Sequence, residues 1–513
     1  MSAPAVTAVE PTDSLLDALA AQPAARRISD GRGYALDGAA LIAAVRALAE
    51  RLTASGCRTL ALHLDNGPDW IVADLAARTA GICLVPLPTF FSAEQIRHVL
   101  RSVPIDAVVS ADPAALAPSH TGRSVPVALP GAGTVRLLTL ASDPAAGAVP
   151  RGTGKVTFTS GSTGRPKGVC LANDALLRQA RVLADAAALR RPRHLCVLPL
   201  STLLENVAGV YAPLLARGEV LAPPLAEIGF QGSSTLDGPR FVAAIARYRP
   251  HSLILTPQLL QLLVAAARGG WTPPSSLAFV AVGGARVPAG LIEAAHALGI
   301  PAYEGYGLSE CASVVSLNSP GAARPGSCGR PLPHVSVRIV AGEIHVAGNA
   351  MLGYAGEPAS WGRDTIATGD LGRLDGDGFL HVEGRLNNLL ISSYGRNISP
   401  EWVESELLAD GSLDDCVVFG DARPYCIALL RARAVQRDDS AIQATVDAAN
   451  GRLPDYARIR AWVRLPEPLA ANREFLTENG RPRRPAIQAR YAALIDAVYA
   501  DPTPLERTEV RIA

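Results

Sequence analysis

The stretch VTFTSGSTGRPKGVCLA, residues 156–172, places hydroxyl side chains, glycines and a lysine between two apolar runs. Hydroxyl groups and the accessible backbone N–H groups around glycine hydrogen-bond phosphate oxygens well, and Lys167 adds a full positive charge. Lysine is rare in this chain. It stands only at positions 155 and 167, so 48 lysines and arginines minus 2 leaves 46 arginines. We therefore interpret this segment as a loop that binds a polyphosphate.

A Walker motif and an exposed linker both fit this segment less well. GTGKVT, residues 152–157, supplies the Gly-Lys pair of a Walker motif, but Val156 stands where that motif needs Ser or Thr for magnesium, and Val149 where it needs glycine. An exposed Ser/Gly linker would have a composition similar to that of the loop. The strand-like VTF before the loop and the apolar helix expected after it favour a binding loop over a linker.

Length and composition indicate a large globular protein. The 513 residues correspond to about three domain-sized units, and 49% hydrophobic against 19% charged residues allow large cores. The formal net charge of +1 provides no field that would attract nucleic acid or an anionic membrane. Phosphate recognition must therefore be local, and we expect no nucleic-acid partner. The sequence leaves open whether the protein is a monomer or a homodimer.

Cysteine usage and the apolar stretches predict a cytoplasmic protein without a membrane span. The eight cysteines form no CxxC pair and no Cys/His spacing suited to zinc, so we interpret them as buried free thiols in a reducing compartment. The first 19 residues lack the basic region and continuous apolar core of a signal peptide. The most apolar stretch, residues 252–267, contains Pro257 and two glutamines and is too short to span a bilayer.

Hydrophobic patterns in the first third of the chain predict an α/β fold. Residues 111–155, rich in Ala, Pro and Gly, are expected to lead from one sheet to a second sheet. Alternating strands and helices are typical of a parallel sheet with helices on both faces. The expected elements are helices at 35–54 and 92–103, the latter capped by Ser92 with Gln95, strands at 58–64 and 106–110, and a helix followed by a strand within 71–87.

The pattern changes in the second half of the chain. From about Ser336, alternating runs separated by Gly-Asp turns predict hairpins in a small barrel-like sheet. After Arg385 a smaller unit begins, and its helix at 398–408 has Ser399 as cap and Pro400 at the first helical position. Before Ser336 the alternation of strands and helices continues, with strands expected at 194–200, 252–257, 276–285 and 302–307.

The motifs together resemble those of the adenylate-forming superfamily, which comprises acyl- and aryl-CoA synthetases, peptide-synthetase adenylation domains and luciferases. FTSGSTGRPKGV resembles the signature loop of that superfamily. The resemblance covers nearly the whole chain, because five further motifs follow in the family's order: GGARVP (283–288), YEGYGLSE (303–310), TGD (368–370), GRLNNLLISSYGRNISPEWVE (384–404) and LTENGRPRR (476–484).

The resemblance implies an α/β fold with two domains. The N-terminal adenylation domain would cover residues 1–386 and contain two helix-flanked sheets and a small barrel-like subdomain. A small mobile α+β domain would cover residues 387–513. In the family this domain rotates about a hinge, which here falls at Asn387. The rotation brings the turn SSYGRN, with Gly395, to the thiol tunnel.

The resemblance also implies a nucleotide site assembled from these motifs. Tyr306 would place its ring on adenine, Asp370 would bind both ribose hydroxyls, and Glu310 would hold Mg²⁺ through carboxylate oxygens, which this hard cation prefers. The expected ATP- and AMP-binding residues are Thr159, Ser160, Gly161, Ser162, Thr163, Gly164, Gly283, Gly284, Ala285, Tyr306, Gly307, Ser309, Asp370 and Arg385, with Lys167, Glu310 and Arg481 as catalytic groups.

Similarity to the family implies two half-reactions. A carboxylate attacks the α-phosphorus of ATP, which gives acyl-AMP and pyrophosphate. The thiol of CoA or of a carrier-protein phosphopantetheine then displaces AMP and forms a thioester. The protein would contribute positioning and charge neutralisation to the first step. ATP and Mg²⁺ are therefore the expected cofactors, and a small carboxylic acid and CoA or an acyl carrier protein are the expected partners.

One position departs from the family pattern. The C-terminal motif of the family ends in Asn-Gly-Lys, whereas this chain has Arg481 after Asn479 and Gly480. Arginine keeps the charge and can bind carboxylate and phosphate together, but its guanidinium is longer and planar. We expect Arg481 to act as the catalytic cation. The alternatives are an impaired homologue that binds nucleotide or acyl-AMP, or an enzyme that carries out mainly the thioester-forming step.

The residues after the strand at 194–200 favour a hydrophobic acid. Peptide-synthetase domains anchor an α-amino group with an Asp in this region, and LPLSTLLENVAG contains none. Long-chain acyl-CoA synthetases resemble it more closely, because they share Glu205, although they usually have histidine at the place of Thr202. Thr202, Leu203 and Glu205 are the expected acyl-pocket residues. We therefore expect the substrate to be a fatty acid or a related hydrophobic carboxylic acid. A luciferase-like oxygenase shares the fold, but no residue here favours it.

Overall fold

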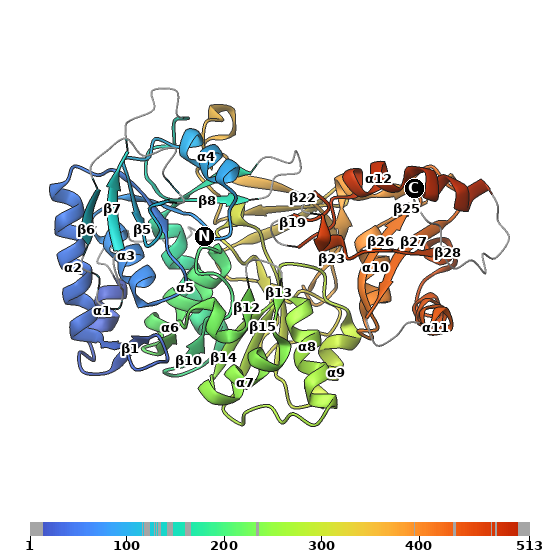
Figure 1. Ribbon diagram of the computed structural model, residues 1–513, viewed down its shortest axis with the longest axis horizontal. Helices are drawn as coiled ribbons and strands as arrows, with labels where there is room; N and C mark the ends of the chain where they lie inside the picture. The colour runs from blue at the N-terminus through green and yellow to red at the C-terminus, as the bar shows by residue number, and fades with distance from the viewer. Residues whose placement is uncertain are drawn as a thin grey trace, which may run out of the picture.

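Two large sheets form the greater part of the molecule, and a smaller part, orange to red at the right of Figure 1, surrounds strands β26 to β28. The fold is α/β, with a large sheet-containing N-terminal domain and a smaller C-terminal domain, which confirms the expected class. The computed structural model describes residues 14–500 except 115, 117–123, 128, 130, 132–134, 141–146, 160–165, 232–234, 394–395, 434–437, 473 and 478–479.

The first large sheet has eight strands in the order β21-β9-β8-β4-β3-β5-β7-β6. Its central strands β4, β3 and β5 pair in parallel, as the alternation of strands and helices predicts. Strand β4 also pairs in parallel with β8, whereas β8 and β9 are antiparallel. The strands are β3 (Thr59–His63), β4 (Cys83–Pro86), β5 (Ala107–Ser110), β6 (Ser124–Val127), β7 (Val135–Thr139), β8 (Thr153–Thr159), β9 (Lys167–Ala172) and β21 (Gly353–Tyr354).

One expectation about this sheet is wrong. The described part of residues 111–155 does not lead to a second sheet, because β6, β7 and β8 all belong to the first one. Strand β7 pairs antiparallel with β5, from Ala107 opposite Thr139 to Ser110 opposite Arg136. The short, proline-interrupted apolar runs of this region give no local signal of that partner. Strands β1 and β2 already belong to the second sheet, and the chain returns to that sheet at β10, after helix α5 (Asn173–Ala187).

The second large sheet has nine strands in the order β18-β17-β16-β15-β14-β10-β11-β1-β2. The strands from β16 to β1 run parallel, and the remaining three are antiparallel at its two edges. The strands are β1 (Arg26–Ser29), β2 (Ala35–Asp37), β10 (Arg193–Leu195), β11 (Glu219–Leu221), β14 (Ser252–Leu255), β15 (Phe279–Val282), β16 (Ala302–Tyr306), β17 (Ser316–Leu317) and β18 (Arg330–Pro331). A separate hairpin joins β12 (Phe230–Gln231) and β13 (Thr235–Leu236).

Helices fill the space between the two sheets and cover their outer faces. The largest core cluster combines side chains of both sheets with those of α2, α3, α5 and the π-helix η2. Helices α7, α8 and α9 cover the outer face of the nine-stranded sheet, and α4 covers that of the eight-stranded sheet. The remaining bounds are α1 (Ser14–Ala20), α2 (Gly38–Ala54), α3 (Pro68–Thr79), α4 (Ala93–Ser102), η2 (Glu205–Tyr211), α6 (Ala212–Leu215), η3 (Leu225–Ile228), α7 (Gly238–Tyr248), α8 (Pro257–Arg268) and α9 (Ala289–Ala297).

Local signals predicted several of these elements well. Ser92 caps α4, and Gln95 completes the capping box, because each side chain accepts a hydrogen bond from the other residue's backbone N–H. Ser399 caps α10 by accepting from the N–H of Trp402, with Pro400 at the first helical position. Both caps confirm the helix starts expected from the sequence.

A four-stranded antiparallel sheet and the C-terminal domain complete the fold. The predicted hairpins form a sheet in the order β19-β20-β22-β23, with β19 (Ser336–Val340), β20 (Glu343–Ala347), β22 (Thr365–Leu374) and β23 (Leu380–Arg385). The later elements are η6 (Leu386–Asn388), β24 (Leu390–Ile391), β25 (Asn397–Ile398), α10 (Pro400–Leu408), β26 (Leu413–Phe419), β27 (Cys426–Ala432), α11 (Asp439–Asn450), η7 (Asp455–Ala457), β28 (Ile459–Arg464), η8 (Leu469–Ala471) and α12 (Arg484–Ala500).

All eight cysteines are buried and none is in a disulfide, which confirms their interpretation as free thiols. Burial raises the pKa of Cys57, Cys83 and Cys170 to about 12, so these thiols stay protonated at neutral pH. Within the described part of the chain, every helix is too short or too polar to cross a lipid bilayer.

Candidate active site

The expected phosphate loop connects the two strands of a hairpin. Thr159 ends β8 and Lys167 begins β9, and these two residues are paired across the hairpin. Strand β9 therefore lies between the loop and the expected helix α5. The sequence pattern did not indicate this strand. Strand β9 is held on its other edge by β21, where Tyr354 pairs with Val169. This pairing places the hairpin base beside a segment that comes much later in the sequence.

Lys167 and Glu310 approach the same tyrosine. The Nζ atom of Lys167 lies 3.0 Å from Glu357 Oε1 and 4.9 Å from the centroid of the Tyr354 ring. The Tyr354 hydroxyl donates to Glu310 Oε1 at 2.9 Å. Burial, and then the charge of Glu310, raise the pKa of Tyr354 above its ordinary value, so the phenol stays a donor. The structure thus brings together the lysine of the loop and the carboxylate that the sequence assigned to Mg²⁺.

Tyr306, Asp370 and Arg385 form a second cluster. The Tyr306 hydroxyl donates to Asp370 Oδ2 at 2.7 Å, and Arg385 Nε lies 2.9 Å from Asp370 Oδ1. Asp370 and Arg385 are cross-strand partners on β22 and β23, while Tyr306 ends β16 of the nine-stranded sheet. Each carboxylate oxygen has two lone pairs, so both oxygens keep one acceptor site for a further ligand. The three residues expected at the nucleoside end of the site therefore lie together.

The backbone around these residues is tightly constrained. A Cβ at Gly307 would lie 1.7 Å from the carbonyl oxygen of Ser313, so no other residue fits there. Ala312 and Ser313 adopt φ values of 56° and 104°, which residues with a Cβ rarely tolerate. The Ser313 hydroxyl is buried without a hydrogen-bond partner among the described residues. Backbone strain and an unpartnered buried hydroxyl thus occur within three residues of Glu310, and strain of this kind is common at functional sites.

Arg481 reaches this region from the C-terminal domain. Its guanidinium donates to the carbonyl oxygen of Gly284, and its backbone N–H donates to Thr477 Oγ1 at 3.0 Å. The side chain stays accessible to solvent, and the charged groups that act on it are Arg385, Asp370 and Glu401. The cation that the sequence placed at the reacting groups thus lies at the expected nucleotide motif, close to Asp370, the carboxylate that is expected to bind ribose.

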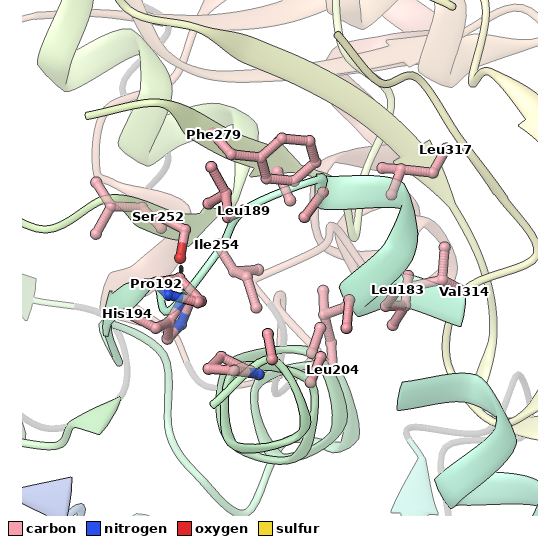
Figure 2. A pocket seen from close by; sticks show the side chains of 18 residues that line it. Leu183, Leu189, Pro192, His194, Leu204, Ser252, Ile254, Phe279, Val314 and Leu317 are labelled. Atoms are coloured by element: carbon pink, nitrogen blue, oxygen red, sulfur yellow. Dashed lines mark hydrogen bonds between the residues drawn. The ribbon is translucent and has the colours of Figure 1, made fainter. Parts of the chain in front are cut away.

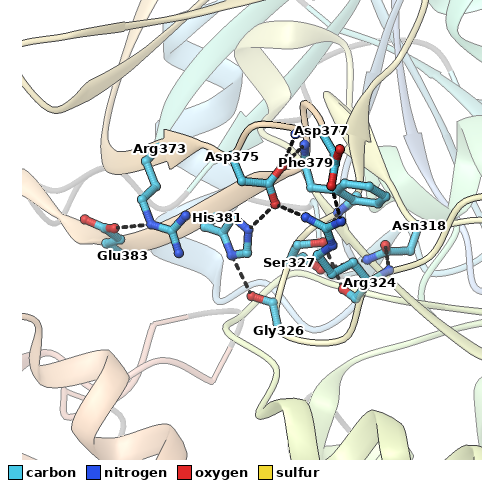
Figure 3. A network of polar contacts seen from close by, with 11 residues as sticks. Asn318, Arg324, Gly326, Ser327, Arg373, Asp375, Asp377, Phe379, His381 and Glu383 are labelled. Atoms are coloured by element: carbon cyan, nitrogen blue, oxygen red, sulfur yellow. Dashed lines mark hydrogen bonds and ion pairs between the residues drawn. The ribbon is translucent and has the colours of Figure 1, made fainter.

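A polar network braces the strands that carry Asp370 and Arg385 (Figure 3). Arg324, in the segment after β17, contacts Asp375 and Asp377 at 2.5 Å each, and His381 Nε2 lies 2.9 Å from Asp375 Oδ2. The hydrogen bond from His381 and the backbone N–H of Phe379 lower the pKa of the Asp375 carboxyl. Arg324 also lies over the Phe379 ring, 4.4 Å from its centroid. The β22–β23 hairpin is thereby fixed to the nine-stranded sheet.

An apolar cavity of about 60 Å³ lies on the inner face of the nine-stranded sheet (Figure 2). Ile254 of β14 and Ala281 of β15 line this cavity. Their neighbours Leu253 and Val280 pack on the outer face of the sheet, and Leu253 also contributes to the cavity wall. The opposite wall comes from α5, α6 and η2. The lining side chains are Leu183, Ala184, Ala187, Leu189, Pro192, His194, Leu204, Ala208, Ala212, Pro213, Ala216, Ser252, Leu253, Ile254, Phe279, Ala281, Val314 and Leu317.

Of the three residues expected in the acyl pocket, none is among the lining side chains. Leu203 lies in the core cluster between the sheets, and Thr202 is half-buried next to it. Glu205 is fully buried and contacts His194, which does line the cavity. Leu204 of the same segment lines the cavity instead.

Glu205 takes part in a buried polar cluster. His194 Nε2 lies 3.0 Å from Glu205 Oε1, and His194 Nδ1 lies 2.9 Å from Ser252 Oγ. Potential metal-ligand atoms of His194, Cys196 and Glu205 lie within 4.8 Å of one another. Both imidazole nitrogens are already engaged in hydrogen bonds, so the geometry fits a hydrogen-bonded pair better than a metal site.

The remaining expected site residues are placed as follows. Gly283 accepts no Cβ easily, because one would lie 3.0 Å from the Gly305 carbonyl oxygen, and Gly284 and Ala285 are exposed at the same edge. Ser309 begins the 3₁₀ turn η4 (Ser309–Cys311). Asn387 lies in η6, between the four-stranded sheet and the C-terminal strands. Ser160, Gly161, Ser162, Thr163, Gly164 and Gly395 lie outside the described residues.

Sequence reasoning missed Tyr354, Glu357 and Ser252. The first two precede the helical turn η5 (Pro358–Ser360) in the segment GYAGEP, and no local pattern marks them as partners of Lys167, which lies far earlier in the sequence. Ser252 begins the predicted strand β14, where a serine at the start of an apolar run gives no sign of a cavity. Only the packing of distant segments brings these side chains to the site.

Two large sheets, polar clusters around Asp370 and Glu310, and a cation from a second domain are the features expected of an adenylate-forming enzyme. Comparisons with known proteins agree with this class. Residues 16–354 match the family described as AMP-binding enzyme, and residues 387–503 match the AMP-binding enzyme C-terminal domain. The chain therefore belongs to the AMP-binding enzyme family, and with it to the adenylate-forming superfamily of AMP-forming acid–CoA ligases.

Relatives with different substrates are similar over most of their lengths. A feruloyl-CoA synthase of Amycolatopsis sp is 31% identical, over 84% of this chain and 87% of its own. A long-chain-fatty-acid–CoA ligase of Mycobacterium bovis is 28% identical, over 84% and 86%. Among solved structures, the anthranilate CoA ligase AuaEII in complex with anthranoyl-AMP superposes with a TM-score of 0.78 at 18% identity, over 95% of this chain and 97% of its own. This last similarity concerns the fold alone.

Proposed function

We propose that the protein activates a hydrophobic carboxylic acid with ATP and Mg²⁺ and transfers the acyl group to CoA. The observation that carries this proposal is the contact of Arg481 with the Gly284 carbonyl, beside the Tyr306–Asp370–Arg385 cluster. A cation is thereby available where acid and α-phosphate must meet. It would offset the negative charge that keeps two anions apart.

The polar clusters support a division of labour along the nucleotide. Asp370 accepts both ribose hydroxyls through its remaining lone pairs, and Tyr306 covers adenine with its ring. Lys167 leaves Glu357 to pair with the β- and γ-phosphates, because a dianionic phosphate is the stronger partner. Thr159, Ser309 and the glycines of the loop supply further hydrogen bonds to the phosphates.

The site also fits a divalent cation. Glu310 Oε1 accepts the hydrogen bond of Tyr354, and no hydrogen bond is recorded for Oε2 among the described residues. A carboxylate oxygen of this kind is the ligand that Mg²⁺ prefers. Bound there, Mg²⁺ would supply charge neutralisation for the phosphates. The hydrogen bond from Tyr354 keeps the carboxylate of Glu310 in place.

The cavity supports a hydrophobic acid as the substrate. Its walls are apolar except at His194 and Ser252, and it contains no charged group that would hold an α-amino or a second carboxylate group. Burying an apolar acyl group there contributes about 25 cal/mol for each Å² removed from water. Leu204 and Ala208 are the residues of η2 that we assign to acid binding, with Thr202, Leu203 and Glu205 behind them.

The second half-reaction requires the C-terminal domain to move. We propose that residues 387–513 rotate about Asn387 as a unit against residues 1–386, which replaces Arg481 at the site by the turn that contains Gly395. CoA is the acceptor that we propose, and a carrier-protein phosphopantetheine is the alternative thiol. Eight buried free thiols are consistent with a reducing compartment, and we propose the cytoplasm.

The proposal is tested by thioester formation. The purified full chain is incubated with ATP, Mg²⁺ and a panel of aliphatic, aryl and amino acids, with CoA or a phosphopantetheinylated carrier protein as acceptor. We expect CoA thioesters of aliphatic or aryl acids, with stoichiometric AMP and pyrophosphate. Thioesters of amino acids alone, or of the carrier alone, would contradict the proposal.

Arg481 favours a second candidate, in which only the thioester-forming step is efficient. The same assay distinguishes it when chemically prepared acyl-AMP replaces acid and ATP. Turnover of acyl-AMP without turnover of acid and ATP would support this candidate. Binding of ATP or acyl-AMP without any release of AMP would indicate the impaired homologue.

A further inference from the structure

Helix α4 presents His98 to both ends of the expected phosphate loop, which connects Thr159 to Lys167. His98 Nε2 lies 2.8 Å from the carbonyl oxygen of Pro166, the residue before Lys167. The imidazole also meets the ring of Phe158, the residue before Thr159, in an edge-on contact with ring centroids 6.4 Å apart. One side chain from a distant helix therefore contacts the chain where it enters the loop and where it leaves the loop.

The chemistry of the carbonyl group fixes the direction of the hydrogen bond between His98 and Pro166. A backbone carbonyl oxygen carries no proton, so His98 Nε2 carries one and donates it. A neutral imidazole with its proton on Nε2 and a doubly protonated imidazolium can both make this bond. The contact therefore does not require a charged histidine.

His98 acts at the point where the strand pairing of the hairpin stops. Thr159 and Lys167 are the last paired residues of β8 and β9 on the side of the loop. Pro166 follows on the loop side, and proline has no N–H with which the ladder could be extended. A side-chain donor to the Pro166 carbonyl therefore fixes the backbone one residue beyond the ladder.

Helix α4 is itself held in place, so His98 is a firm anchor. The capping box described above fixes the first turn of the helix. Ile96 and Val99 are buried in the core cluster on the outer face of the eight-stranded sheet. His98 is half-buried, and Phe158 packs against the same cluster. Core packing, and not the loop, thus sets the position of the imidazole.

We propose that His98 positions the phosphate loop for the β- and γ-phosphates of ATP. This inference rests on the proposed function, in which Lys167 and Thr159 bind phosphate groups of ATP. His98 is a positioning residue, because it acts through the Pro166 carbonyl and so holds the start of β9 in one place before ATP binds. Preorganisation of this kind favours ATP over AMP, because AMP lacks the two phosphates that the loop would bind.

Equilibrium binding of ATP and of AMP to the full-length protein, measured by calorimetric titration, tests the inference. His98→Phe keeps a ring beside Phe158 and removes the donor, whereas His98→Gln offers an amide N–H of similar reach. The free energy of one neutral hydrogen bond corresponds to about a three- to tenfold change in a dissociation constant. We expect the Kd for ATP to rise by this factor in His98→Phe and to rise less in His98→Gln, while the Kd for AMP stays at the wild-type value.

Two results of this titration would overturn the inference. An unchanged Kd for ATP in His98→Phe would show that the loop does not depend on the hydrogen bond. Equal increases in the Kd for ATP and for AMP would show that the substitution disturbs the fold as a whole. Arg97→Ala, at the neighbouring exposed position of α4, is the matched control and should bind both nucleotides as the wild type does.

The two half-reactions give a second readout. In His98→Phe the KM for ATP in ATP–pyrophosphate exchange should rise, whereas thioester formation from supplied acyl-AMP should keep the wild-type rate. Equal losses in both half-reactions would contradict a role confined to the phosphate loop. Failure of the proposed function is distinguishable, because the wild type would then form no CoA thioester, while the two Kd values would still show whether His98 positions the loop.

Discussion

At the scale of single residues, Asp370 is the group on which we expect nucleotide binding to depend most. Both of its oxygens are held, by Tyr306 at 2.7 Å and by Arg385 at 2.9 Å, so the carboxylate is oriented before a ligand arrives. Asp370→Asn keeps the shape and removes the charge. Hydrogen bonds to a charged group contribute about 1.5–3 kcal/mol, so we expect KM for ATP to rise at least about tenfold.

Tyr306→Phe is the matched control for that prediction. It keeps the ring against adenine and removes only a neutral donor, so KM for ATP should rise by less than in Asp370→Asn. Steady-state kinetics with saturating acid measures both variants. Equal and small effects of the two substitutions would contradict the assignment of Asp370 to the ribose.

Glu304, two residues before Tyr306, makes stability depend on pH. Burial raises the pKa of its carboxyl to about 7 from an ordinary value of 4.5, while the Cys328 thiol and Arg286 oppose the shift. Between these two values the folded state holds a proton that the unfolded state has released. The contribution of Glu304 therefore falls as pH rises from 4.5 to 7, by at most about 3 kcal/mol in total.

Glu304→Gln should remove this pH dependence. Chemical unfolding at pH 5 and at pH 8 gives the free energy of unfolding, and the loss between the two should be smaller in the variant than in the wild type. Glu293→Gln, on the exposed face of α9, serves as control and should behave as the wild type. A wild-type loss that Glu304→Gln leaves undiminished would show that Glu304 is ionised at pH 5.

At the scale of elements, the π-helix η2 depends on a buried ion pair. Lys155 Nζ lies 2.7 Å from Asp74 Oδ1 and also bonds Asn206 Oδ1 and the Tyr211 hydroxyl, near the two ends of η2. Lys155 is 2% exposed and Asp74 1%. This network accounts for the second lysine of the chain, because the longer, planar guanidinium would not fit the same closed site. Lys155 lies on β8, the strand before the expected phosphate loop, so its hydrogen bonds connect this strand to η2, which forms part of the cavity wall.

Breaking this pair should destabilise the protein strongly. Asp74→Ala leaves an uncompensated buried ammonium group and should lower the free energy of unfolding by about 3–5 kcal/mol. The double variant Asp74→Leu with Lys155→Met removes both charges and should recover part of that loss. Urea unfolding measures both. A loss of less than about 1 kcal/mol in Asp74→Ala would mean that the pair is not buried in solution.

The elements also show how far sequence reasoning reaches. The start of α4 at Ser92 and that of α10 at Ser399 were predictable, because a cap and its helix are neighbours in the chain. Strand β9 and the placement of β6 and β7 were not, because their partners are distant in sequence. It was not predictable either that Leu204, and not Leu203, lines the cavity, because two adjacent leucines look alike in the sequence.

At the scale of the whole molecule, the arrangement of the domains brings Arg481 to Gly284, as the proposed adenylation step requires. Gln261 on α8 donates to the Leu408 carbonyl at the end of α10 at 2.7 Å, and Arg286 lies 6.0 Å from the Trp402 ring while it donates to backbone carbonyls of β23. The contacts of Gln261 with Leu408 and of Arg286 with Trp402 hold the C-terminal domain beside the nine-stranded sheet while Arg481 reaches Gly284. The motifs predicted which residues meet, but not the contacts that hold them.

Gln261→Ala should weaken this arrangement selectively. The free energy of one neutral hydrogen bond corresponds to about a fivefold change in an equilibrium constant. We therefore expect the rate of adenylation to fall severalfold, while the rate of thioester formation from supplied acyl-AMP does not fall. Gln258→Ala, at an exposed position of the same helix, is the matched control. Equal losses in both half-reactions would show that the contact acts on stability and not on the domain arrangement.

Arg481 is a single residue whose position depends on the arrangement of the two domains. ATP–pyrophosphate exchange measures its contribution to adenylation most directly. The exchange is followed with an acid that forms a CoA thioester, in wild type, Arg481→Lys and Arg481→Ala. We predict exchange in wild type and in Arg481→Lys. In Arg481→Ala the exchange rate should fall about a hundredfold or more, because the removal of one preorganised group that stabilises developing charge has an effect of this size. Exchange in Arg481→Ala at the wild-type rate, or none in wild type and Arg481→Lys, would contradict the catalytic role of this cation.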